Sequence, residues 1–135
     1  MKILIDTNVI LDVLYDREGF FDDSSAVWDI CQTGKADGYI SALSIPNIVY
    51  IMRKELDPQR IQQLVEQITM IFKVVDLRES DLKDAADSFS DDYEDALHIS
   101  QAKRIRADHM ITRNVRHFEN STVSVLTPSQ LIEKL

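Results

Sequence analysis

Acidic side chains stand at the two places in the sequence where chemistry is easiest to predict. Asp6 directly follows the short apolar run 2–5, and Asp95 begins a second apolar stretch at 96–99. A carboxylate beside a core needs a partner, and carboxylates that converge from separate elements repel one another unless a cation lies between them. Oxygen ligands suit a hard divalent ion such as Mg²⁺ or Mn²⁺. These residues therefore predict a metal site that activates water for phosphodiester hydrolysis.

Further acids surround Asp95. Asp91, Asp92 and Glu94 open the same predicted helix, and helical spacing places Asp95 on one face with either Asp91 or Asp92. Carboxylates in a first helical turn also interact favourably with the positive helix end, so Asp91 and Asp92 are explained equally well as dipole partners. His98 could bind a metal, but a histidine on a mostly apolar helix is more often packed or hydrogen-bonded.

The elements that must position these residues follow from the hydrophobic pattern. Short apolar runs predict strands at 2–5, 38–43, 72–75, 109–112 and 123–126. Helical spacing and start signals predict helices at 9–14, from 22–24 to 34, and at 44–52, 57–71, 79–89, 91–106 and 128–135, with caps at Thr7 or Asn8, Ser44, Asp57 and Thr127.

Strands that alternate with helices need crossover connections. We therefore expect an α/β fold with three layers, α/β/α, around a mainly parallel sheet of four to five strands, and residues 1–135 are enough for one domain. Ligands of such folds bind beyond the carboxyl ends of the strands. Asp6, Asn8, Ser41, Thr112 and Asn114 should lie there.

Composition narrows the class of protein. Apolar residues make up 44% of the chain and charged residues 28%, with three Gly and three Pro, which is globular usage rather than disorder. No apolar stretch approaches the roughly 20 residues of a membrane span, so we expect a soluble, cytoplasmic protein that does not bind a membrane. The single cysteine, Cys31, excludes an internal disulfide and a cysteine-based zinc site, and is predicted to be a small core residue.

Charge is unevenly distributed. A net charge of −8 argues against a module that grips nucleic acid by bulk electrostatics. Residues 76–95 contain nine acids and two bases, whereas residues 96–117 contain five bases and one acid. Two solvated helix faces would explain this pattern equally well if these segments did not carry the predicted site.

Four segments together resemble the successive motifs of PIN-domain proteins. They are MKILIDTNVI at 1–10, ISALS at 40–44, DYEDAL at 92–97 and ITRN at 111–114, and their order matches the family over essentially the whole chain. The resemblance implies a Mg²⁺- or Mn²⁺-dependent ribonuclease fold with acids at the carboxyl edge of a parallel sheet. It also implies that the protein could be the toxin of a toxin–antitoxin pair, with an antitoxin partner, and that it could form a homodimer.

The resemblance assigns roles to individual residues. Asp6 matches the first metal-binding acid, Asp95 the acid before alanine on the late helix, and Asn8 a polar residue that supports the site. Asn47 stands where many relatives have glutamate, and Asn114 where many have aspartate. Asparagine offers a neutral oxygen but supplies no charge and no general base. One branch of the family carries both asparagines together with extra acids, here Asp92 and Glu94.

The main prediction is a metal-dependent endoribonuclease, and the resemblance to the family implies that it yields a 5′-phosphate product. Asp6, Asp95 and Glu94 or Asp92 would hold the metal and act in catalysis. Water or substrate would be supported by Asn8, Asn114, Ser41, Asn47 and Thr112. RNA phosphates would contact Arg53, Arg113 and Arg116, although a solvated surface explains each arginine equally well.

Two alternatives stay open. The asparagines could mark a site that no longer cleaves, in a module that binds RNA or protein. A receiver-like signalling domain fits poorly, because only Asp6 ends the first strand and Asn114 stands where a lysine would be expected. Trp28, Tyr39 and Tyr50 lie in apolar patterns and are predicted to be core or interface residues rather than surfaces on which bases stack.

Overall fold

The computed structural model describes residues 1–89, 91–118 and 121–135, and these residues form a five-stranded parallel sheet. Its strand order is β3-β2-β1-β4-β5, so the first strand lies in the middle. The register pairs Ile3 with Gly38 on one side and with His109 on the other. The strands are β1 (Lys2–Ile5), β2 (Asp37–Ser41), β3 (Lys73–Val75), β4 (His109–Ile111) and β5 (Val125–Leu126).

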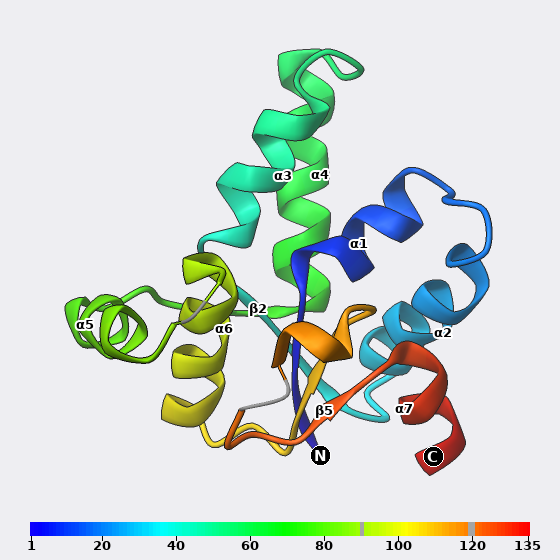
Figure 1. Ribbon diagram of the computed structural model, residues 1–135. Coiled ribbons are helices and arrows are strands. Elements are labelled where there is room, and N and C mark those ends of the chain that lie inside the picture. The colour runs from blue at the N-terminus through cyan, green and yellow to red at the C-terminus, as the bar shows by residue number, and fades with distance from the viewer. Residues whose placement is uncertain (90, 119–120) are drawn as a thin grey trace.

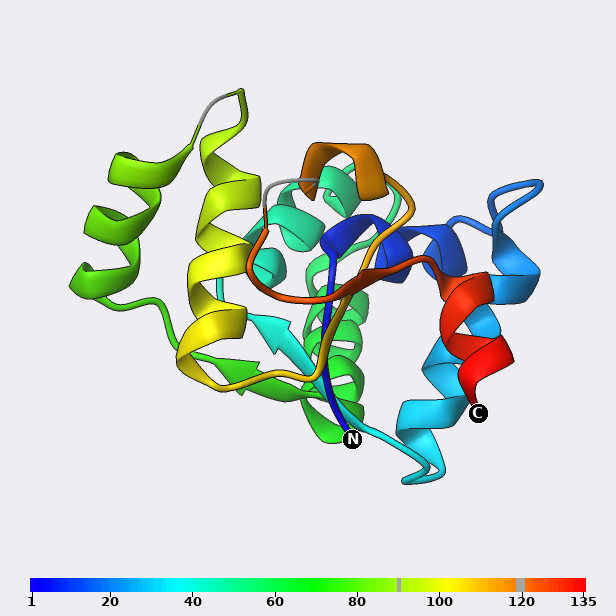
Figure 2. The same cartoon turned by 60° about the horizontal axis from the view of Figure 1, so that its bottom comes forward.

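Helices cover both faces of this sheet, which confirms the predicted three-layer α/β/α fold. The helices α5 and α6 pack together on one side, whereas α1, α2 and α7 lie on the other (Figure 2). The helices α3 and α4 form a hairpin that stands out from the body (Figure 1). The bounds are α1 (Thr7–Leu14), α2 (Phe21–Gln32), α3 (Ser44–Met52), α4 (Pro58–Ile71), α5 (Glu79–Ser88), α6 (Tyr93–Arg104) and α7 (Pro128–Lys134), with a 3₁₀ turn η1 (Val115–Phe118).

The alternation of side chains along β1 divides the core in two. Ile3 and Ile5 are fully buried in the larger cluster, with side chains of α1, α2, α4 and α7. Leu4 points to the opposite face and packs with Ala102 of α6 and with Val75. A central parallel strand is buried on both sides, which explains why residues 3–5 form an unbroken apolar run. In the described ranges no helix combines the length and the apolar character needed to cross a membrane.

Gly38 marks a close approach between β2 and α2. A Cβ atom at this position would lie 2.5 Å from Sγ of Cys31, so any larger residue would force strand and helix apart. Cys31 itself is buried in the larger cluster, as predicted. Glycine at this position therefore allows α2 to pack closely on β2.

Element boundaries were predicted less well than the elements. Asp57 and Thr127 cap α4 and α7 as predicted, each accepting a hydrogen bond from the backbone N–H three residues later. The predicted caps at Thr7 or Asn8 and at Ser44 are wrong, because the hydroxyls of Thr7 and Ser44 hydrogen-bond each other at 2.6 Å inside the protein. This buried pair ties α1 to α3, and α1 begins after Asp6 instead.

Further boundaries also differ from the prediction; helix α6, for example, covers Tyr93–Arg104 rather than 91–106. Helix α2 begins earlier than expected, at Phe21, without a side-chain cap. The second strand ends at Ser41 rather than at residue 43, and the last strand contains only Val125 and Leu126. The 3₁₀ turn at Val115–Phe118 was not predicted, since its four residues are too few to show a helical period.

Candidate metal centre

A pocket of about 330 Å³ opens at the carboxyl end of β1. Four acids from two elements line it: Asp6 at the end of β1, and Asp92, Glu94 and Asp95 at the start of α6. Asn8 belongs to the same lining, and α3 supplies a further wall. The structure therefore brings together the acids that the sequence singled out, at the edge of the sheet where the topology places ligands.

Asp6 is fixed by the neighbouring strand. Its backbone N–H donates to the carbonyl of Ile111 at 2.9 Å, which extends the ladder between β1 and β4 by one residue. Its side chain is 6% exposed, and Oδ2 accepts a hydrogen bond of 2.9 Å from the hydroxyl of Thr112. The Thr112 oxygen in turn accepts from the backbone N–H of Asn114 at 3.2 Å. This chain of bonds leaves Asp6 little freedom to rotate.

Asp95 carries a charge that its surroundings oppose. The side chain of Asp92 caps α6 by accepting the backbone N–H of Asp95 at 3.1 Å. Burial, followed by the charges of Asp92 and Asp6, raises the pKa of Asp95 to about 6, against the opposing effect of His117. Oδ2 of Asp95 is buried without a hydrogen-bond partner among the described residues, although Nδ1 of His117 lies 3.3 Å away. A cation at this place would remove the conflict.

His98 lies on the same helix, with Nδ1 3.7 Å from Oδ1 of Asp6. Its ring is 2% exposed, and neither nitrogen has a hydrogen-bond partner within the described part of the chain. Burial lowers the pKa of His98, while the nearby charges of Asp6, Glu94 and Asp92 act in the opposite direction. His98 is therefore packed, one of the two outcomes, packed or hydrogen-bonded, that the sequence favoured over a metal ligand.

The carboxylate oxygens at this site suit a small hard cation that keeps several water molecules better than a cation that needs many protein ligands. Among the described residues, no three carboxylate, imidazole or thiol groups are arranged as ready-made metal ligands. Magnesium is commonly held by one or two carboxylates and keeps several water molecules. Asp6 and Asp95 supply two such carboxylates, and Oδ2 of Asp95, which has no hydrogen-bond partner among residues 1–89, 91–118 and 121–135, is available as a metal ligand. The residues present therefore fit Mg²⁺ or Mn²⁺.

The two unusual asparagines lie in different environments. The amide of Asn47 on α3 donates a short hydrogen bond to Oε1 of Glu94, which joins α3 to α6 across the pocket. Asn114 is exposed and does not line this pocket; it borders a separate hollow with Arg116 and His117. Ser41 is also outside the pocket, since its buried hydroxyl accepts the backbone N–H of Leu43 at 3.1 Å. Of the expected supporting residues, Asn8 and Asn47 thus line the pocket directly and Thr112 acts on it through Asp6.

The three arginines predicted to contact RNA also separate. Nε of Arg113 lies 2.8 Å from Oδ2 of Asp12, a fully buried carboxylate of α1, and its guanidinium packs over Phe20. This arginine therefore has an internal partner. Arg116 is exposed and borders a second pocket of about 530 Å³ that shares Asp92 and Asp95 with the first. Arg53 is exposed beside Tyr50 at the end of α3.

Sequence reasoning missed two residues at the site. Tyr50 lines the first pocket with 64% of its surface exposed, so of the two roles predicted for it, core or interface, the core is wrong. Trp28 is buried as predicted, and Tyr39 is half-buried against the smaller cluster. His117 was hidden in the basic segment, and only the turn η1 brings it to Asp95. The spacing of Asn47 and Tyr50, one helical turn apart, was a signal that could have placed Tyr50 at the pocket.

Comparisons with known proteins agree with this geometry. The chain is similar in fold to the FitAcB complex from Neisseria gonorrhoeae, with 21% identity over 94% of this chain and 98% of that one and a TM-score of 0.71. It is similar to a toxin-antitoxin complex from Klebsiella pneumoniae, with 18% identity, coverage of 93% and 97% and a TM-score of 0.71. DNA-bound VapBC from Salmonella typhimurium gives 19% identity, coverage of 95% and 98% and a TM-score of 0.68.

Because the sequence identities are so low, these structural matches show a shared fold and nothing finer. A search among curated proteins gives no match to this sequence. The model of the PIN domain, by contrast, matches residues 2–116, which include Asp6, the α6 acids and the segment after β4. The chain therefore belongs to the PIN-domain family.

Proposed function

We propose that this protein is a metal-dependent endoribonuclease and the toxin of a toxin–antitoxin pair. The observation that carries the proposal is the pairing of Asp6 and Asp95 at one pocket, where Asp95 has a raised pKa and a buried oxygen that finds no hydrogen-bond partner in the described part of the chain. Membership of the PIN-domain family supports nuclease chemistry, since proteins of this family are generally metal-using nucleases. RNA is proposed as the substrate on the same family grounds.

The side chains at the pocket would divide the work. Asp6 and Asp95 would hold Mg²⁺ or Mn²⁺, with Glu94 or Asp92 able to add a ligand, and the ion would activate water and neutralise charge on the phosphoryl group. The hydroxyl of Thr112 would orient Asp6 through its 2.9 Å hydrogen bond. Asn8 would support water or substrate. Hydrolysis would break the bond between phosphorus and the 3′ oxygen, which leaves a 5′-phosphate and a 3′-hydroxyl.

An antitoxin partner is part of the proposal. The similar folds include structures described as a toxin-antitoxin complex and as VapBC bound to DNA. A small basic or neutral partner encoded beside this chain would suit its net charge of −8. A homodimer, expected from the family, remains a prediction to be tested by the mass of the purified protein in solution.

Cleavage of a mixed single-stranded RNA, with and without Mn²⁺ at low salt, tests the proposal. The wild type should cut only with metal, and both Asp6→Asn and Asp95→Asn should cut at least about a hundredfold more slowly, because each removes a charged metal ligand. Asp87→Asn is a matched control, since Asp87 is an exposed acid on α5 outside the pocket. Unchanged cleavage by Asp6→Asn would refute the assignment of the metal site.

A second function is favoured by one observation. The amide of Asn47 donates a short hydrogen bond to the carboxylate of Glu94. Among the described residues, no group of three side chains is arranged to bind a metal ion. A PIN-like domain of this kind could bind RNA or protein without cutting. If the folded wild type cuts nothing under conditions in which a known metallonuclease cuts, and still binds RNA, this second function replaces the first.

A further inference from the structure

One wall of the acid-lined pocket is not acidic. Asn47, Tyr50 and Ile51 of α3 form it, and the hydrogen bond from Asn47 to Glu94 holds this wall against the start of α6. Tyr50 is 64% exposed and Ile51 41% exposed. A large aromatic side chain left in water beside a polar pocket loses the stabilisation that burial would give it. The position of Tyr50 at the pocket suggests that a ligand bound in the pocket contacts its side chain.

The ring of Tyr50 is held in place before any ligand arrives. The guanidinium of Arg53 lies 3.8 Å from the centre of the ring, and the same guanidinium donates a hydrogen bond to the carbonyl of Tyr50. A cation over an aromatic face is attracted by the ring electrons and limits its rotation. Since Arg53 covers one face, the 64% exposure of Tyr50 comes from the rest of the side chain.

We propose that Tyr50 is a stacking platform for one nucleobase of the RNA strand whose phosphate binds at Asp6 and Asp95. This inference rests on the proposed function and names how its substrate is held. Single-stranded nucleic acids are commonly bound by aromatic faces that stack on bases beside positive charges that follow the backbone. Tyr50 and Arg53 supply these two elements next to the acids that would hold the metal ion.

The placement favours RNA over a protein ligand on this wall. Tyr50 lines the same cavity as the four acids, so a strand bound in this cavity would meet the aromatic wall and the metal ligands together. A nucleic acid strand presents a phosphate and a base on either side of one sugar, which matches an acid wall with its cation and an aromatic wall. Stacking also places the strand in one register, and a positioned strand reacts faster than a freely tumbling one.

Steady-state cleavage of short RNA oligonucleotides by Tyr50→Ala and Tyr50→Phe tests this platform. Tyr50→Ala should raise KM about 5- to 150-fold, the range that corresponds to the 1–3 kcal/mol of one base–aromatic stack. Tyr50→Phe keeps the ring and should stay within about twofold of the wild type. The matched control is Met70→Ala, because Met70 is 86% exposed on α4 and outside the pocket; its KM should be unchanged.

A second measurement separates stacking from a general structural effect. Replacing single bases of the oligonucleotide with abasic sites, one position at a time, should reveal one position that raises KM in the wild type. At that position Tyr50→Ala should show no further loss, because the partner of the ring is already gone. Equal abasic losses in the wild type and in Tyr50→Ala at every position would overturn the proposal.

The outcomes separate this inference from the proposed function. Metal-dependent cleavage with an unchanged KM for Tyr50→Ala would overturn the platform and leave the nuclease intact. If the wild type does not cleave, fluorescence anisotropy of the same labelled RNA decides: weaker binding by Tyr50→Ala supports the platform in a binding module, and equal binding overturns it. A Tyr50→Ala effect on self-association alone, with RNA binding unchanged, would also overturn it and assign the ring to a protein contact.

Discussion

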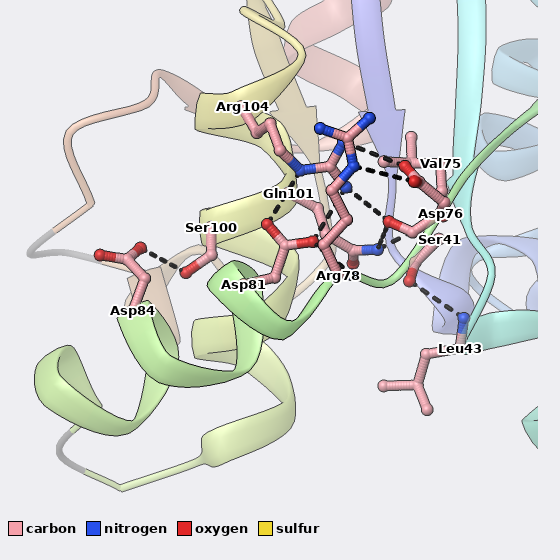
Figure 3. A network of polar contacts seen from close by, with 10 residues as sticks. All are labelled: Ser41, Leu43, Val75, Asp76, Arg78, Asp81, Asp84, Ser100, Gln101 and Arg104. Carbon is pink, nitrogen blue, oxygen red and sulfur yellow. Dashed lines mark hydrogen bonds and ion pairs between the residues drawn. The ribbon is translucent and has the colours of Figure 1, made fainter.

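Two aspartates, Asp81 on helix α5 and Asp95 on the neighbouring helix α6, have pKa values that are shifted in opposite directions. Asp81 is 3% exposed, and Arg104 donates to both of its oxygens at 3.0 and 2.9 Å while the backbone N–H of Arg78 adds a third bond (Figure 3). Burial alone would raise the pKa of Asp81, but the bonds and charge of Arg104 lower it below its usual value. Asp95 is also largely buried, yet burial and two neighbouring carboxylates raise its pKa to about 6.

The difference separates structural acids from site acids. Arg104 supplies the positive charge that compensates Asp81. The buried Asp12 is compensated in the same way by Arg113 and Arg17, and it also accepts a hydrogen bond from Ser24. Asp95 and Asp6 share a pocket with two more acids, and in the described ranges the only basic side chain within ion-pair distance of Asp95 is the imidazole of His117. An acid whose charge the fold compensates contributes to stability, whereas an acid left with like charges stores energy that a bound cation can release.

We call Asp81, Arg104 and Arg78 the compensated cluster. Breaking this cluster should have the largest effect on stability. Arg104→Met removes both donors from Asp81 and leaves a buried, unpaired carboxylate, so the free energy of unfolding should fall by about 2–4 kcal/mol. Urea unfolding followed by circular dichroism measures the change. Lys83→Met is the matched control: it removes the exposed pair of Lys83 with Glu79, and should cost less than about 0.5 kcal/mol. Similar losses in the two variants would contradict the comparison.

The four acids of the pocket, Asp6, Asp92, Glu94 and Asp95, form the uncompensated cluster. A divalent cation bound there should raise the free energy of unfolding by slightly less than Arg104→Met lowers it. An ion that binds only the folded protein adds about 2.7 kcal/mol at a hundred times its Kd. Thermal unfolding of the wild type during a Mn²⁺ titration measures this gain, with Na⁺ at matched ionic strength as control. Arg104→Met should keep the full response, while Asp6→Asn should lose most of it. A response of equal size in Asp6→Asn would place the cation elsewhere on the protein.

The sequence predicted the acids of the site because their positions depend on topology. Asp6 follows a short apolar run that predicts a strand, and the α6 acids stand at the start of the late helix, so a parallel sheet brings both to one edge. The parallel sheet and the three layers followed from the same alternation of short strands and helices, whereas the strand order β3-β2-β1-β4-β5 was not predicted. These features depend on periods that a single sequence displays directly.

The contacts that refine the site could not be predicted in this way. The pairing of Thr7 with Ser44 depends on how two helices cross, and Arg113 could point to solvent or to Asp12 until the side chains are placed. Tyr50 lies in an apolar sequence pattern, which favours the core, but α3 belongs to a hairpin that stands out from the body and leaves the ring exposed (Figure 1). Tertiary geometry decides such cases.

Removing one charge from each cluster should change stability in opposite directions. Without divalent metal at pH 7, Asp95→Asn relieves the repulsion from Asp92 and Asp6, so unfolding should require about 0.5–2 kcal/mol more than in the wild type. Asp81→Asn should be destabilising, because a neutral amide cannot accept both donors of Arg104. Urea unfolding in the presence of a chelator measures both. Destabilisation by both substitutions would mean that Asp95 is as well compensated as Asp81.

Acid should weaken the compensated cluster, an effect confined to low pH. Arg104 lowers the pKa of Asp81 in the folded protein, so the stability that Asp81 contributes is complete above the unfolded value near 4 and is lost as pH falls through the lower folded pKa. Urea unfolding of the wild type and of Asp81→Asn should therefore give a constant difference from about pH 7 to pH 5 and a shrinking one below about pH 4. A difference that shrinks already between pH 7 and pH 5 would mean that the ion pair does not hold Asp81 ionised, because only a carboxylate with a raised pKa takes up its proton there.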